Sequence, residues 1–301
     1  MSKLHWLALS AIPGIGGVTA RKLVERFGSA EAVLDAPDEE LKRMPRITAE
    51  VVARLRMVSL DLLEAELAAL AEEGLQVVTW DDADYPLNLR QVGDAPPVLF
   101  VRGDLLPEDA HAVAIVGTRQ PTPGAMALAE TLAQELARRG LTIVSGLALG
   151  IDTAAHRGAL QAAGGRTLAV LGSGLRVIHP RENVPLAETI SQRGALLSEF
   201  HPNTPARGPN LMARDRIVSG LSRAVIVVEA SEKSGSLDTA AKAQRQGRLL
   251  FAVPGSPGTQ ALLAEGAEPL DLRTADLDGL SQRLRDHTAH RDETQLSLWN
   301  T

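Results

Sequence analysis

The 301-residue sequence contains no cysteine. This absence excludes disulfides, catalysis by a thiolate, and zinc ribbons or fingers that need cysteine ligands. Aromatic residues make up only 3% of the chain, so leucine, valine and alanine must build the hydrophobic core. No long apolar run and no signal peptide are visible, which predicts a cytoplasmic protein that does not cross a membrane.

The charge of the chain is a weak guide to its partner. The net charge of −6 argues mildly against a nucleic-acid partner, because proteins that bind nucleic acids are usually basic. The charges are segregated along the sequence, however, and acidic residues crowd into residues 31–40 and 81–84. Between positions 207 and 223 a single acid, Asp215, stands among Arg207, Arg214, Arg216 and Arg223. This local asymmetry keeps a nucleic-acid partner open.

The sequence predicts a small helical domain over residues 1–74. Residues 4–34 show the pattern of two helices joined by Pro13-Gly14-Ile15-Gly16, which is typical of helix-hairpin-helix or SAM-like modules. The hairpin amides of such modules hold a nucleic-acid backbone without reading sequence, although a hairpin can also serve only for packing. A poorer second copy over residues 44–58 lacks the glycines, and residues 60–73 predict a charged linking helix.

Residues 75–285 predict a second domain of the α/β class. Short apolar runs rich in β-branched residues alternate with helical patterns, which is typical of a Rossmann-like, mostly parallel sheet with helices on both faces. We expect strands at residues 76–80, 98–101, 112–116, 142–145, 167–171, 195–198, 224–228 and 249–253. We expect helices between 123 and 139 and at residues 151–163, 185–192, 214–221 and 236–245. Residues 286–301 are polar and unpatterned, which indicates a tail or a linker.

The stretch around the first strand, helix and strand of this domain predicts an anion site. The strand at 112–116 ends at Gly117-Thr118-Arg119, and the strand at 142–145 ends at Gly146. In open parallel sheets, ligands bind in the crevice beyond the carboxyl ends of the strands. A glycine there lets a backbone N–H approach a ligand oxygen, and an arginine adds a fixed positive charge, so the pair suits a phosphate.

Other residues are candidates for the same site. Ser234-Gly235-Ser236 precedes a helix, where it can seat an anion or merely cap the helix. Arg214 and Arg216 can bind a ligand or form a network of salt bridges, and Arg181 lies in a loop past a strand end. Phe200 can stack on a base or pack in the core.

The sequence shows little sign of catalysis. Gly172-Ser173-Gly174 lacks the third glycine of a dinucleotide fingerprint, and no Walker A motif or nucleophile elbow is present. Asp152 and His156 lie four residues apart, a spacing that suits an acid–base pair but more often a local helix contact. Glu199 and Glu229 follow strand ends, where we expect them to anchor loops through backbone N–H groups. No cofactor and no metal site is predicted.

These motifs together resemble the DNA-processing protein A (DprA/Smf) family. Gly117-Thr118-Arg119 is similar to the Gly-Ser/Thr-Arg motif of that family. Further similar motifs are Ser145-Gly146-Leu147-Ala148-Leu149-Gly150-Ile151-Asp152, Leu171-Gly172-Ser173-Gly174, His179-Pro180-Arg181, Arg214-Asp215-Arg216 and Ser234-Gly235-Ser236. The resemblance spans roughly residues 76–272, and the helical module is similar to an accessory domain that many members carry.

The resemblance implies a non-enzymatic single-stranded DNA-binding protein. Such a protein protects incoming strands and loads the RecA recombinase during natural transformation, and its Rossmann-like domain forms a homodimer. Carried over to this chain, the pocket contains Gly117, Thr118, Arg119, Gly146, Arg181, Arg214, Arg216, Ser234, Gly235 and Ser236. Asp215 departs from the family pattern, which has Asn there. The winged-helix domain at the C-terminus of many members is not found in these residues.

Two alternatives stand beside this interpretation. Pro254-Gly255-Ser256-Pro257-Gly258-Thr259 resembles the PGGxGT loop of nucleotide phosphoribohydrolases, which implies an enzyme that binds a nucleoside monophosphate. A carboxylate such as Glu265 would then assist cleavage, although it lies too far after Thr259 for that pattern. A partner-binding scaffold without a ligand is the second alternative, and it leaves the clustered glycines and arginines unexplained.

Overall fold

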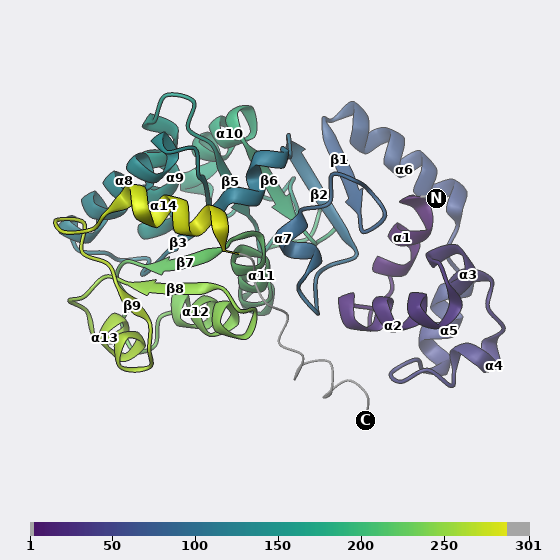
Figure 1. Cartoon of the computed structure of the whole chain (residues 1–301). Helices are drawn as coiled ribbons and strands as arrows, with labels where there is room; N and C mark the ends of the chain where they lie inside the picture. Colours follow the sequence, from purple (N-terminus) through teal and green to yellow (C-terminus); the bar gives the residue numbers. More distant parts are fainter. Residues whose placement is uncertain (1–2, 288–301) are drawn as a thin grey trace.

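The computed structural model describes residues 3–287 (Figure 1). The chain begins with a helical part whose elements are α1 (Lys3–Ser10), α2 (Gly17–Phe27), α3 (Ala30–Asp35), α4 (Asp38–Leu41), α5 (Ala49–Arg56) and α6 (Leu60–Glu72). The side chains of Ser29, Thr48 and Ser59 cap the N-termini of α3, α5 and α6 by accepting backbone N–H groups.

The helical part contains two turns of the same kind. Gly14 has a φ of +98°, and Arg46, at the corresponding place of a second Pro-X-Ile turn, has a φ of +68°. The second copy therefore forms without a glycine at that position, and the arginine adopts the left-handed conformation that side chains rarely take.

The α/β part contains a sheet of nine strands within residues 3–287. The strands are β1 (Leu75–Thr79), β2 (Val98–Gly103), β3 (Ala112–Val116), β4 (Thr142–Ser145), β5 (Thr167–Val170), β6 (Ala195–Ser198), β7 (Ala224–Val227), β8 (Leu249–Ala252) and β9 (Glu268–Pro269). Their order is β1-β2-β6-β5-β4-β3-β7-β8-β9. β2 pairs antiparallel with β1 and β6, whereas the other neighbours are parallel. The predicted mostly parallel sheet is confirmed.

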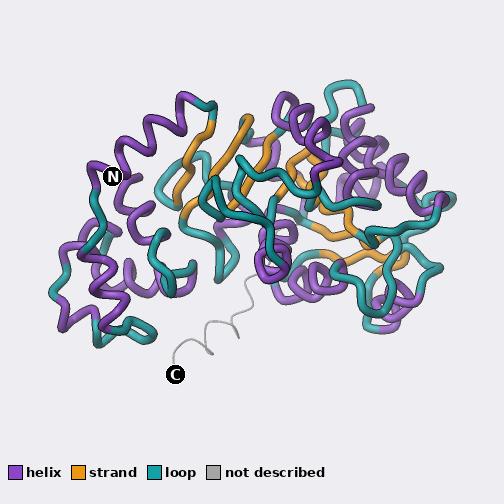
Figure 2. Tube along the Cα trace, turned by 180° about the vertical axis from the view of Figure 1, so that it is seen from behind, coloured by secondary structure: helices purple, strands orange, loops and turns teal. Residues whose placement is uncertain are grey.

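Helices cover both faces of the sheet (Figure 2). The helices of this part are α7 (Leu87–Arg90), α8 (Pro123–Arg138), α9 (Ile151–Gln161), α10 (Val184–Arg193), α11 (Gly208–Leu221), α12 (Ser236–Arg245), α13 (Pro257–Ala264) and α14 (Leu277–Asp286), with short 3-10 turns at Pro107–His111 and Arg181–Asn183. Alternate residues of β3 show the layering. Val113 and Ile115 pack with α8, α9 and α14, while Ala114 and Val116 pack with α11 and α12.

Several boundaries differ from the sequence-based expectation. α11 begins at Gly208 rather than at residue 214, because Pro209 occupies the first turn of the helix, where its missing N–H costs nothing. α13 begins at Pro257, inside the stretch that resembles the PGGxGT loop, and α13, α14 and β9 were not among the expected elements. The predicted tail at 286–301 falls almost wholly outside the described residues. None of the helices in residues 3–287 is long and apolar enough to span a bilayer.

The helical part and the sheet share one hydrophobic cluster. Trp6 and Leu9 of α1 are buried together with Leu75 and Val77 of β1 and with Phe100 of β2. The ring of Trp6 packs edge-on against the ring of Trp80. The Nε1 of Trp6 donates a 2.7 Å hydrogen bond to Asp81 Oδ2. The core is therefore continuous across the predicted boundary near residue 75.

Two further contacts fix the helical part on the sheet. A Cβ atom at Gly17 would lie 2.1 Å from the carbonyl oxygen of Ala95, so the first turn of α2 is packed directly on a loop of the α/β part. Lys3 Nζ donates a 2.7 Å hydrogen bond to the carbonyl oxygen of Val77 in the edge strand β1. The first hairpin thus serves as a packing surface at Gly17.

Because the core is shared, Trp6→Ala should destabilise both parts at once. Replacing a buried tryptophan by alanine costs about 3–5 kcal/mol. Chemical denaturation followed by far-UV circular dichroism should show one transition at a lower midpoint. Two separated transitions, with the second at the wild-type midpoint, would contradict the shared core.

Candidate nucleic-acid-binding crevice

A crevice of about 570 Å³ opens at the carboxyl ends of β3, β4 and β7. It lies where the chain order of the strands reverses, because β4, β5 and β6 extend from one side of β3 and β7 from the other. Ligands of open α/β sheets bind at such a point. Its principal lining residues are Gly117, Thr118, Arg119, Gly146, Asp152, Met212, Arg214, Asp215, Lys233, Ser234, Gly235 and Ser236.

The floor of the crevice contains a buried guanidinium, that of Arg214. Its Nη1 donates a 2.8 Å hydrogen bond to the carbonyl oxygen of Val170 at the end of β5, and its Nε lies 3.1 Å from Asp215 Oδ1. Gly146 provides the space, since a Cβ atom there would lie 1.5 Å from Arg214 Nη1. The absence of a side chain at Gly146 therefore admits a cation into the floor of the site.

The backbone N–H of Gly146 has a partner within the protein. Asp152 Oδ2 accepts from the backbone N–H of Gly146 at 3.1 Å and of Ala148 at 3.3 Å. Burial raises the pKa of Asp152, while the Arg214 guanidinium and the two amides oppose that shift. Asp152 thus acts as a buried counter-charge and loop anchor, and Gly146 contributes space rather than a free amide.

The loop that follows β3 is fixed by hydrogen bonds to Glu229, a residue that follows β7. Thr118 N–H donates a 2.7 Å hydrogen bond to the carbonyl oxygen of Glu229. Glu229 Oε2 in turn accepts from the backbone N–H and the hydroxyl of Thr122 at 2.9 and 3.0 Å. The expected loop-anchoring role of Glu229 is confirmed, and these contacts fix the loop that presents Arg119.

The loop before α12 forms the opposite wall. The hydroxyl groups of Ser234 and Ser236 form a 2.8 Å hydrogen bond with each other. No side chain caps the N-terminus of α12. Within residues 3–287 no hydrogen bond uses the backbone N–H of Gly235 or Ser236. Two donors at a helix N-terminus therefore remain available beside the buried Arg214 guanidinium.

Two cations and one apolar side chain stand at the rim. Arg119 and Lys233 are exposed, and Met212 is 58% exposed. Lys233 and Met212 are not among the residues that were expected at the DNA site. The position of Lys233 directly before Ser234-Gly235-Ser236 was the available signal for it, whereas an exposed methionine on α11 has no sequence signature.

Arg216 and Arg181 do not line the crevice. Arg216 forms a bidentate pair with Glu199 at 2.5 and 2.7 Å, and its Nε lies 3.3 Å from Asp94 Oδ2. Glu199 therefore binds a guanidinium instead of the expected backbone N–H groups. Arg181 is exposed in the 3-10 turn that precedes α10. Phe200, half-buried after β6, also lies outside the crevice lining.

His156 has a structural environment. Thr167 Oγ1 donates to the carbonyl oxygen of Ile143, so His156 Nδ1 donates to Thr167 Oγ1 at 2.7 Å. Its Nε2 is buried without a partner among the described residues. Burial, and to a lesser extent the Arg214 charge, lowers the pKa of His156 to about 3, so the ring is neutral. A neutral, enclosed imidazole does not suit acid–base catalysis near neutral pH.

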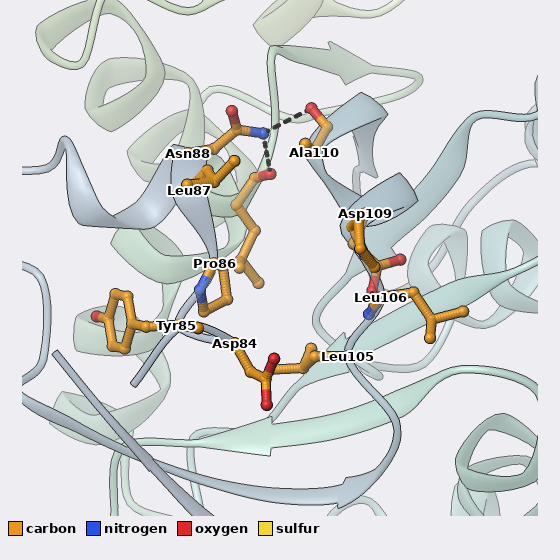
Figure 3. A pocket seen from close by; sticks show the side chains of 12 residues that line it. Asp84, Tyr85, Pro86, Leu87, Asn88, Leu105, Leu106, Asp109 and Ala110 are labelled. Atoms are coloured by element: carbon orange, nitrogen blue, oxygen red, sulfur yellow. Dashed lines mark hydrogen bonds between the residues drawn. The ribbon is translucent and has the colours of Figure 1, made fainter. Parts of the chain in front are cut away.

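A smaller cavity of about 150 Å³ lies at the opposite, amino end of the strands (Figure 3). Its walls are mainly apolar, and Pro86, Leu105 and Leu106 are among the residues that line it. Asn88 Nδ2 donates to the carbonyl oxygens of Ala110 and Leu221 at 3.0 and 2.9 Å. No lysine or arginine lines this cavity, so it offers no fixed positive charge to an anion.

The loop that resembles the phosphoribohydrolase motif lies outside the crevice lining. Ser256 Oγ accepts from the backbone N–H of Ala230 at 3.0 Å and pairs with Thr259 Oγ1 at 2.8 Å. Glu265 forms the C-terminal cap of α13. The hydroxyls of Ser256 and Thr259 are therefore engaged in holding the start of α13 against the end of β7.

A Rossmann-like sheet with an arginine-floored crevice at its switch point defines an α/β protein that carries a helix-hairpin-helix module. The sequence model of DNA recombination-mediator protein A matches residues 76–277, and the chain belongs to this family. A SAM-like helix-hairpin-helix tandem matches residues 7–58. Both matches confirm the resemblance that the motifs indicated.

Relatives from several bacteria are similar over most of this chain. DNA processing protein DprA of Bacillus subtilis is 42% identical over 211 residues, which cover 68% of this chain and 71% of that protein. Protein Smf of Synechocystis is 37% identical over 275 residues, which cover 88% and 69%.

Two solved structures are similar. DprA of Streptococcus pneumoniae aligns with a TM-score of 0.77 and 32% identity, over 96% of this chain and 99% of that one. DNA processing protein A of Helicobacter pylori, described with a single-stranded DNA binding mode, aligns with a TM-score of 0.61 and 33% identity, over 71% and 98%.

Gly146→Ala should disturb the floor of the crevice. The added methyl group overlaps the Arg214 guanidinium, and overpacking of this kind costs about 1–3 kcal/mol of folding free energy. The melting temperature should fall. Gly124→Ala is the matched control, because a Cβ atom there meets nothing within 4 Å. Equal melting temperatures of the two variants would contradict the tight fit around Arg214.

His156 should make the folded state less stable in acid. The unfolded chain binds a proton at this residue below about pH 6.5, whereas the folded chain does not until about pH 3. The contribution of His156 to stability is complete above pH 6.5 and falls by about 1.4 kcal/mol per pH unit below it. Denaturant titrations from pH 7 to 5 should show a shallower decline for His156→Leu. Identical declines would contradict a neutral buried imidazole.

Proposed function

We propose that this chain binds single-stranded DNA in the crevice at the carboxyl ends of β3, β4 and β7. The observation that carries the proposal is the set of donors that converge there. Arg119 and Lys233 are exposed at the rim, Arg214 lies in the floor, and the N–H groups of Gly235 and Ser236 are available in the wall. Backbone phosphates accept hydrogen bonds from such groups without regard to base sequence.

The membership of the chain in its family supports this proposal. The Helicobacter pylori relative is described with a single-stranded DNA binding mode, and it aligns over 71% of this chain. We infer that Gly117, Thr118, Arg119, Arg214, Ser234, Gly235 and Ser236 form the DNA site, with Lys233 added. Gly146 shapes the floor, and Arg181 contacts the strand outside the crevice.

The role of the protein in the cell is inferred from its resemblance to the family. We infer that the protein protects incoming single strands in the cytoplasm and loads RecA onto them during natural transformation, as a homodimer formed through the α/β part. Catalysis is not part of this function. The neutral, buried ring of His156 and the buried position of Asp152 support a binding role.

Fluorescence anisotropy with a labelled dT oligonucleotide and a matching duplex tests the proposal. Binding should favour the single strand and weaken steeply with salt, with a slope of about −0.7 per phosphate neutralised. Absence of single-strand binding at low salt would overturn the proposal. Release of free base from nucleoside monophosphates would then support the enzyme alternative.

Arg119→Ala should weaken binding of the dT oligonucleotide by about 1–3 kcal/mol, because a charge-assisted phosphate contact is lost. The salt slope should also become shallower by about 0.7. Arg157→Ala is a suitable control, since Arg157 is an exposed arginine of α9 that does not line the crevice. If both variants bind like the wild type, Arg119 is not a DNA ligand.

A further inference from the structure

The crevice contains a carboxylate beside its central cation. Asp215 follows Arg214 on α11 and lines the crevice, with its side chain 13% exposed and its Oδ1 3.1 Å from Arg214 Nε. An ionised carboxylate offers only hydrogen-bond acceptors, and so does a phosphodiester. The two groups cannot bond to each other, and their negative charges repel at close range.

The charges around the crevice are nearly balanced. Three cations line it, namely Arg119, Lys233 and Arg214, against the two carboxylates Asp152 and Asp215. Asp152 is committed to the backbone N–H groups that it accepts. One proton on Asp215 would therefore double the formal positive charge that a phosphate meets, from one to two.

Charged groups from three helices face Asp215. Arg214 lies beside it on α11, Asp152 approaches from α9, and Asp238 and Lys242 approach from α12, where they form their own pair at 2.5 Å. Burial raises the pKa of Asp215 to about 6. Arg214 and Lys242 oppose this shift, while Asp152 and Asp238 add to it. The carboxyl group thus lies close to the point at which it exchanges a proton with solvent near neutral pH.

We propose that Asp215 takes up a proton from solvent when a phosphate of single-stranded DNA enters the crevice, so that binding of the strand tightens as the pH falls. This inference rests on the proposed DNA-binding function. Once protonated, the Asp215 hydroxyl becomes a donor, so the repelling group turns into a ligand for a phosphate oxygen.

The sign of the pH dependence follows from linkage. A bound phosphate adds negative charge near Asp215 and raises the pKa of its carboxyl above the value of the free crevice. Between the two pKa values the complex holds one proton that the free protein lacks. The dissociation constant should therefore rise with pH above about 6, by up to tenfold per unit, and level off above the pKa of the complex.

The test is anisotropy with a labelled dT oligonucleotide and the full chain from pH 5.5 to 8.5 at constant ionic strength. Thymine does not titrate in this range. The wild type should bind several-fold more weakly at pH 8 than at pH 6. Asp215→Asn, which keeps an acceptor for Arg214, should bind with little pH dependence and more tightly than the wild type at pH 8.

Asp238→Asn is the matched control. It removes a neighbouring negative charge but leaves Asp215 in place, so the pH dependence should persist. Calorimetry of the wild type at pH 7 in two buffers of different ionisation enthalpy gives a second readout that needs no variant. It should report uptake of up to one proton per bound crevice.

The outcomes separate this inference from the proposed function. Binding that does not change with pH, or a pH dependence that survives in Asp215→Asn, overturns the role of Asp215 and leaves DNA binding intact. Absence of binding by the wild type at every pH overturns the DNA-binding function itself. A pH dependence lost in Asp238→Asn but kept in Asp215→Asn would assign the proton to another group.

Discussion

The burial of one guanidinium shapes the candidate site. Moving a cation out of water costs several kcal/mol unless its hydrogen bonds and its charge are matched. Arg214 meets this requirement through the carbonyl oxygen of Val170, the carboxylate of Asp215 and the nearby charge of Asp152. The missing side chain of Gly146 provides the room. The ends of β4 and β5, the start of α9 and the middle of α11 are thus fixed around a single charge.

Much of the fold could be predicted from the sequence because buried parallel strands consist of short apolar runs, which are easily recognised. The strand at 195–198 and the helix at Ser236–Arg245 agree with the structure at both ends. The first residue of α11 could not be predicted from the sequence, because Gly208-Pro209 is equally compatible with a turn and with the start of a helix. β9 consists of Glu268 and Pro269, and two residues are too few to show a period.

The site could be predicted in part, for a geometric reason. The segments that follow parallel strands lie at the edge of the crevice because of the strand direction alone, independently of how their side chains pack. Gly117-Thr118-Arg119 and Ser234-Gly235-Ser236 therefore both line the crevice. Arg214 and Arg216 are two positions apart on one helix and point to opposite sides of it. One enters the crevice floor and the other binds Glu199, and only the packing of α11 on the sheet decides which.

The two outer strands limit how copies of this protein can associate. At one edge of the sheet, Lys3 Nζ donates a hydrogen bond to the carbonyl oxygen of Val77 in β1. At the other edge, β9 is two residues long and ends in Pro269, which has no N–H to offer. Within residues 3–287, each edge of the sheet therefore has at least one position that cannot bond to an added strand, and this disfavours strand-by-strand growth into fibres. Side chains on helices and loops are therefore better suited than a continued sheet to build a specific assembly of this protein.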